Sequence, residues 1–171
     1  MLLAVLIASA LGTPATASLP DPLAMAGEGR LQCYRPDVQK KTCQSIASYL
    51  KTGPGTYDNK ALIPVAAHAT LETHTPVVIR GDAVCGYMRG EDVLAGTLRL
   101  DGEVLAPEKA KPFLERIAQG VAPMSGKEIC TRYESSGAGL SAKVSIGGTY
   151  QPDGDQVVTW VSPADGYTVQ P

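Results

Sequence analysis

Residues 97–121 read TLRLDGEVLAPEKAKPFLERIAQGV, and this stretch carries the clearest secondary-structure signals of the chain. Its first part places TLRL and EVL on either side of Asp101-Gly102. Both central residues of a type I′ turn need a positive φ, which Asp and Gly tolerate, so this pattern predicts a β-hairpin. The second part carries apolar residues at helical spacing and predicts an amphipathic helix. The apolar residues of that helix are Ala110, Phe113, Leu114, Ile117, Ala118 and Val121.

The start of this helix is left open by its two prolines. Pro107 and Pro112 are both within or next to the helical pattern. Proline is tolerated in the first turn of a helix, but in the interior it removes a hydrogen bond. Either the regular part of the helix begins near Lys111, or its first turn is irregular.

Runs of β-forming residues alternate with turn signals on both sides of this stretch. Residues 42–50 fit a helix face or a strand, and we favour a strand because Gly53-Pro54-Gly55 follows as a turn signal. The strands predicted are 42–50, 57–71, 75–87 with a bend at Gly81-Asp82, 127–134, 140–150 and 156–162.

Strands thus outnumber the single confident helix. The predicted fold class is α+β: a mostly antiparallel sheet with one amphipathic helix packed on it, stapled by disulfides. The core is expected to be aliphatic, because the chain has only one Trp and one Phe beside seven Tyr.

The N-terminal residues predict export. Residues 1–17 carry no charged side chain and combine an apolar run with the small residues Ala15-Thr16-Ala17, which is typical of a signal peptide cleaved before Ser18. A short buried N-terminal helix is the alternative. Residues 18–29 are rich in Pro and Gly and predict a flexible lead-in, followed by a single globular domain over 30–171. No apolar run approaches the roughly 20 residues of a transmembrane helix, so we expect no transmembrane anchor.

Export gives the four cysteines a structural meaning, because disulfides form in the periplasm or outside the cell. Three pairings of Cys33, Cys43, Cys85 and Cys130 are possible. We favour Cys33–Cys43 with Cys85–Cys130, because the first pair closes a short loop across a turn-prone segment. No Cys-x-x-Cys pair is present, which argues against a zinc or redox site. We therefore expect no metal and no cofactor.

The charge balance argues against a nucleic-acid partner. Fifteen basic and seventeen acidic residues give a net charge of −2, and the sequence pI is about 5.7. Nucleic-acid-binding domains usually carry a basic face and a high pI.

His68, Glu72 and His74 are the candidate catalytic or metal-binding residues. In one strand the three side chains would share a face, because their numbers differ by even steps. His68 and His74 would then be about 20 Å apart, too far to share a metal ion. Glu72 and His74 could form an acid–base pair or meet a metal, whereas a polar row facing solvent is the simpler interpretation.

Four short motifs surround the later cysteines and the end of the chain. They are Lys41-Thr42-Cys43-Gln44-Ser45, Ala83-Val84-Cys85-Gly86, Glu128-Ile129-Cys130-Thr131 and Asp165-Gly166-Tyr167. Together they resemble a group of small exported alphaproteobacterial proteins of unassigned function. The resemblance implies export and an architecture centred on cysteines, and it implies no activity.

The leading hypothesis from the sequence is a non-catalytic, disulfide-stabilised domain in the periplasm or medium. It would bind a protein, a peptide or a cell-envelope component. One alternative is a small periplasmic hydrolase or metal-dependent enzyme that uses His68, Glu72 or His74. Another is a secreted enzyme inhibitor, for which the 51–55 loop would have to be rigid and exposed.

Overall fold

A computed structural model of the protein describes residues 21–137 and 139–170. The predicted signal peptide, residues 1–17, lies outside the described residues. The helices of the described part are α1 (Gly90–Leu94) and α2 (Pro107–Val121), with short 3-10 helices η1 (Ala24–Glu28), η2 (Ala122–Met124), η3 (Pro152–Gly154) and η4 (Pro163–Asp165). The strands are β1 (Leu31–Tyr34), β2 (Thr42–Cys43), β3 (Ser45–Gly53), β4 (Thr56–Ala66), β5 (Ala69–Arg80), β6 (Ala83–Tyr87), β7 (Thr97–Leu100), β8 (Glu103–Val104), β9 (Glu128–Ser136), β10 (Gly139–Ile146), β11 (Thr149–Tyr150), β12 (Gln156–Val161) and β13 (Thr168–Val169).

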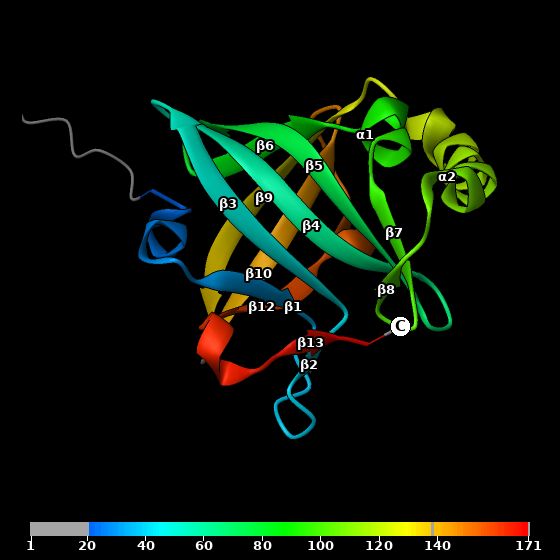
Figure 1. Ribbon diagram of the computed structural model, residues 1–171. Coiled ribbons are helices and arrows are strands. Elements are labelled where there is room, and N and C mark those ends of the chain that lie inside the picture. Colours follow the sequence, from blue (N-terminus) through cyan, green and yellow to red (C-terminus); the bar gives the residue numbers. More distant parts are fainter. Residues whose placement is uncertain (1–20, 138, 171) are drawn as a thin grey trace, which may run out of the picture.

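Eight strands of the described part of the chain form a closed antiparallel barrel (Figure 1). Their order is β4-β3-β1-β12-β10-β9-β6-β5, and β5 pairs back with β4 to close the ring. Strand β7 pairs with the first residues of β5, β8 pairs with β7, and β11 pairs with the last residues of β10. Strands β2 and β13 form a separate parallel pair beside the barrel.

The α+β architecture predicted from the sequence is wrong, because the sheet closes on itself. Alternate side chains of the strands point inward, where Tyr57, Val77 and Val84 form one buried cluster. The sheet therefore covers its own apolar face, and no helix is needed for that purpose. Helix α2 packs instead beside β7, with Ala110 and Leu114 buried while Phe113 remains 55% exposed.

The predicted hairpin and helix within residues 97–121 are confirmed as elements. Asp101 and Gly102 both have positive φ values, 50° and 84°, as a type I′ turn requires. Helix α2 begins at Pro107 and contains Pro112 in its interior, so it does not begin as late as Lys111.

One predicted strand is in fact two strands. The sequence favoured a single strand over 57–71, but β4 ends at Ala66 and β5 begins at Ala69. The turn between them contains His68, which adopts a left-handed backbone with φ of 62°. Since this turn contains no Gly, Pro, Asn or Asp, it carried no signal in the sequence.

The segment 21–29, assigned to the flexible lead-in, instead packs against the barrel. Leu23 is only 1% exposed and contacts the cluster that contains Tyr57 and Val84. The Asp21 carboxylate accepts hydrogen bonds from the Leu23 amide (2.8 Å) and the Tyr57 hydroxyl (3.2 Å). This segment therefore belongs to the folded domain.

The described residues contain no helix that is long and apolar enough to span a membrane.

Candidate functional site

The three residues singled out in the sequence do not form one site. Glu72 and His74 lie on the outer face of β5, whereas His68 lies in the preceding turn. His68 contacts Asp101 of the β7–β8 turn, with 3.3 Å between Nδ1 and Oδ1. The predicted row is thus divided between two surface contacts.

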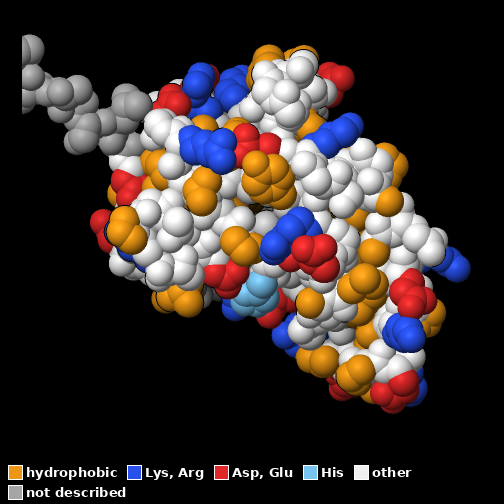
Figure 2. Space-filling view, turned by 90° about the horizontal axis from the view of Figure 1, so that it is seen from above, with side chains coloured by type: hydrophobic (Ala, Val, Ile, Leu, Met, Phe, Trp, Pro, Cys, Tyr) orange, Lys and Arg blue, Asp and Glu red, His pale blue; other side chains and the backbone are white. Residues whose placement is uncertain are grey.

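His74 is flanked by two carboxylates on the surface. Its Nδ1 lies 2.7 Å from Oδ2 of Asp58, and its Nε2 lies 3.9 Å from Oε1 of Glu72. The His74 side chain is 57% exposed, and Glu72 also lies 3.9 Å from the guanidinium of Arg99. In the part of the chain that the structure describes, no three His, Cys, Asp or Glu side chains are placed to hold a metal ion. The contacts of His74 are those of a solvated polar cluster on the surface, and Figure 2 shows side chains of both charge signs interspersed on one face.

Both disulfides form in the pairing favoured from the sequence. Cys33–Cys43 links β1 to β2, and Cys85–Cys130 links β6 to β9. Cys85 and Cys130 are directly opposed in the ladder between these two strands, with their Cα atoms 4.0 Å apart. The second disulfide thus fixes the spacing of two neighbouring barrel strands.

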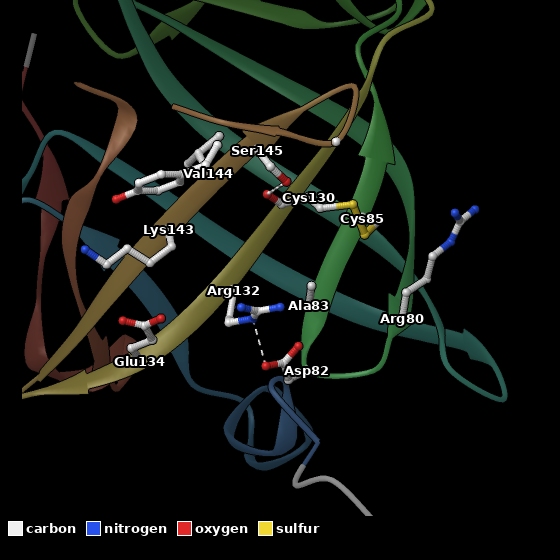
Figure 3. Close-up of a pocket in the computed structure, with 12 residues that line it drawn as sticks. Arg80, Asp82, Ala83, Cys85, Cys130, Arg132, Glu134, Lys143, Val144 and Ser145 are labelled. Carbon is white, nitrogen blue, oxygen red and sulfur yellow. Dashed lines mark hydrogen bonds and ion pairs between the residues drawn. A yellow bond between two sulfur atoms is a disulfide. The ribbon is translucent and has the colours of Figure 1, made fainter. Parts of the chain in front are cut away.

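A groove lies over this second disulfide on the outer face of the barrel (Figure 3). Its volume is approximately 620 Å³, within the usual range for ligand sites of about 300–1,000 Å³. Strands β6, β9 and β10 supply the floor. The β5–β6 turn and β11 line its sides, with Asp82 from the turn and Gly148 and Tyr150 at the other side.

Exposed side chains of both charges line this groove. The Arg132 Nε atom lies 2.8 Å from Oδ2 of Asp82, a contact visible in Figure 3. Arg80 contacts Oε1 of Glu128 at 3.0 Å. Both guanidinium side chains remain more than half exposed, at 56% for Arg132 and 57% for Arg80. Glu134 is also exposed, and it forms no ion pair with the described residues. The groove can therefore contact an acidic and a basic group of one partner.

A hydrogen-bonded trio fixes the β10 side of the groove. Lys143 Nζ and the Tyr150 hydroxyl both donate to Oδ2 of Asp155, at 2.5 Å and 2.6 Å. These two hydrogen bonds lower the pKa of the Asp155 carboxyl, and the Lys143 bond is the larger cause. The same bond raises the pKa of Lys143. The pair is therefore ionised at neutral pH, with its charges oriented by each other.

The groove was not predictable from the sequence, because its residues come from distant segments. One signal was available: Cys130, Arg132 and Glu134 are at alternate positions and must share a face in a strand. That signal becomes useful only when the Cys85–Cys130 register is known, because the register places the strand of Ala83 beside that of Arg132.

Comparison with protein-family models, with curated proteins and with solved structures finds no match to this chain.

Proposed function

We propose that this protein is an exported, disulfide-stabilised domain that binds a protein, a peptide or a cell-envelope component without catalysis. The observation that carries the proposal is the groove of Figure 3. It combines a disulfide-linked floor with exposed charges of both signs. Such a surface suits recognition of a segment that presents complementary charges, because paired rim charges favour orientation and specificity.

The arrangement of charges in the groove favours binding over proton transfer. Lys143 and Asp155 are ion-paired, as are Arg132 and Asp82. General acid–base catalysis needs a group whose pKa lies near the working pH and whose proton is within reach of a bound substrate. The lowered pKa of Asp155 and the raised pKa of Lys143 move both groups away from neutrality.

The enzyme alternative has less support. The His74 imidazole contacts Asp58 and Glu72, but its side chain is 57% exposed on the outer surface of β5. An acid–base pair usually acts in a site that excludes water. A catalytic role would be supported if His74→Ala abolished a hydrolytic activity that Arg132→Ala left intact.

Export is supported by the two disulfides, because they persist in oxidising compartments. Protein recovered from a periplasmic or culture fraction is expected to begin at Ser18. Its intact mass should be about four hydrogens below that of the reduced chain, one pair for each disulfide. Recovery of the chain with residues 1–17 attached and its cysteines reduced would contradict export.

Binding in the groove can be tested by site-specific crosslinking. A photoreactive residue at Ser145, in the groove, should capture a component of a solubilised envelope extract, and unlabelled protein should compete with it. The same photoreactive residue at Lys109, which is exposed on α2, is the placement control.

Charge variants then assign the captured component to the groove. The double variant Arg132→Ala/Glu134→Ala should weaken competition about tenfold, because it removes one charge of each sign from the lining. Arg116→Ala, an exposed arginine on α2, is the matched control and should compete like the parent protein. Equal capture from Ser145 and Lys109, or undiminished competition by the double variant, would overturn the proposal.

A further inference from the structure

The inside of the barrel contains a cavity that is separate from the groove. Its volume is approximately 210 Å³, and inward side chains of β1, β3, β4, β5, β6 and β9 line it. Tyr87 at the end of β6 is 47% exposed and belongs to the lining, as does Met88. Tyr34, Tyr49 and Asn59 are only partly buried. The cavity is therefore open to solvent rather than sealed in the core.

A cluster of three tyrosines and one glutamine lies at the wall of this cavity. The hydroxyls of Tyr34, Tyr49 and Tyr133 lie 3.0, 2.8 and 3.1 Å from Oε1 of Gln32. The Tyr34 and Tyr133 hydroxyls are also 2.9 Å from each other. Tyr34 and Tyr49 belong to the cavity lining, so the cluster connects Gln32 to the open space.

The hydrogen-bonding capacity of this cluster is not satisfied internally. Two of the three hydroxyls can donate to the two lone pairs of Gln32 Oε1, and the third can donate across the 2.9 Å contact between Tyr34 and Tyr133, so the unpartnered group is the Gln32 amide nitrogen. The Gln32 side chain is 0% exposed, and its Nε2 has no partner among the described residues. Exchanging the amide oxygen and nitrogen of Gln32 would still leave one atom without a partner, because the oxygen would then occupy the unpartnered position. Gln32 itself does not line the cavity, but Tyr34 and Tyr49 do, and their hydroxyl oxygens keep lone pairs that can accept a hydrogen bond.

Two further polar side chains of the lining are available. Asn59 and Thr131 form no side-chain hydrogen bond with the described residues. Thr75, by contrast, donates to Oδ2 of Asp92 on α1 at 2.9 Å, and Asp92 is itself paired with Arg89 at 2.6 Å. The carboxylate that contacts Thr75 is thus already paired with a guanidinium.

The lining itself is uncharged. It combines the polar groups above with the apolar side chains of Val77, Val84 and Ile129. Burial raises the pKa of Tyr34 and of Tyr49 well above the ordinary value of 10.0, so both hydroxyls stay neutral. An ionised ligand would lose its hydration here without gaining a counter-ion, which is strongly unfavourable.

We propose that the barrel interior is a binding site for a small uncharged molecule that carries hydrogen-bonding groups on an apolar body. Asn59, Thr131 and the tyrosine hydroxyls bind its polar groups. Val77, Val84 and Ile129 contact its apolar part. This site is independent of the groove, because it lies on the opposite face of the same strands.

Three probes of one shape but different charge test this proposal. Benzamide is neutral, benzoate is an anion and benzamidinium is a cation. In a ¹H–¹⁵N NMR titration of the purified protein, benzamide should shift the backbone signals of Asn59, Thr75 and Thr131 saturably. Benzoate and benzamidinium should bind at least about tenfold more weakly, because neither finds a counter-charge. Phenol, a second neutral probe, should shift the same signals.

Variants locate the probe in the interior. Thr131→Val and Asn59→Leu each remove a hydrogen-bonding group from the lining and should weaken benzamide binding about tenfold. Tyr150→Phe removes an exposed hydroxyl at the groove, and Arg132→Ala/Glu134→Ala removes two groove charges. Both should leave benzamide binding unchanged, which separates this proposal from that for the groove.

Three results would overturn the assignment. If neither benzamide nor phenol produced a saturable shift, the interior would be closed core with no binding site. Equal affinity for benzamide and benzoate would contradict a neutral ligand. Shifts that persist unchanged in both Thr131→Val and Asn59→Leu would place the probe elsewhere.

Discussion

At the scale of single residues, Asp155 shows how one carboxylate can hold two strands and a turn together. It accepts hydrogen bonds from Lys143 on β10 and from Tyr150 on β11. Because these bonds favour the ionised carboxylate, the pKa of Asp155 in the folded protein is below its ordinary value of 3.8. The contribution of these two bonds to the stability of the folded protein is therefore complete above pH 3.8, and it is lost as the pH falls through the lowered pKa of Asp155.

Asp155→Asn should lower the melting temperature at neutral pH. The difference from the parent protein should shrink as the pH falls below 3.8, where the unfolded parent also takes up a proton. Thermal unfolding followed by circular dichroism between neutral and strongly acidic pH measures this. Asp153→Asn, an exposed carboxylate of the same turn, should have little effect. A pH-independent difference for Asp155→Asn would contradict the ion pair.

Leu23 connects the N-terminal segment to the barrel core. Its side chain is 1% exposed, so Leu23→Ala removes buried methyl groups from the cluster around Tyr57. The free energy of unfolding should fall by about 2–5 kcal/mol, measured by urea denaturation. Leu50→Ala is the control, because Leu50 is 70% exposed and should change the free energy by less than about 0.5 kcal/mol. Similar values for the two variants would mean that residues 21–29 do not contribute to the core.

At the scale of secondary-structure elements, α2 contains a local defect. Pro112 lies in the helix interior, where it cannot donate to the carbonyl of Glu108 and its ring is crowded by that carbonyl. Pro112→Ala should raise the free energy of unfolding by about 1–3 kcal/mol, since Pro112 is exposed and contributes little packing. Pro107→Ala should change it much less, because Pro107 is the first residue of the helix. Destabilisation by Pro112→Ala would show that the ring is needed for packing.

Elements were predictable from the sequence where a local rule was sufficient. The Asp101-Gly102 turn requires two positive φ values, and the residue types alone indicate it. The turn at His68 has a left-handed residue but none of the residue types that usually mark turns. It can therefore be recognised only from the pairing of β4 with β5. Strand β1, which is only four residues long, follows a segment whose Pro and Gly content suggested flexibility.

At the scale of the whole molecule, closure of the barrel was not predictable from periodicity. Alternation within β4 or β5 indicates a buried face, but it does not say whether a helix or the far side of the same sheet covers that face. The candidate site has the same limitation. The groove needs the register of β6 with β9, and the interior cavity needs six strands in one ring.

The two disulfides should contribute unequally to the stability of the whole domain. Cys33–Cys43 closes a loop with a sequence separation of 10, and Cys85–Cys130 one with a separation of 45. From loop entropy alone, the paired substitutions Cys33→Ala/Cys43→Ala and Cys85→Ala/Cys130→Ala should cost about 2.7 and about 4 kcal/mol. Urea denaturation of each variant measures these costs. The reverse order would show that the contacts around Cys33 outweigh the entropic effect.

The position of β12 in the barrel has a consequence for biosynthesis. Strand β12 lies between β1 and β10, so the first barrel strand pairs with the last, and Leu31 is opposite Val161. A nascent chain cannot close this ring until residue 161 has left the ribosome. Pairing between such distant segments makes ring closure slow relative to local hairpin formation. The ring consequently stays open until its last strand has been made, whereas a local hairpin such as β4–β5 can form earlier.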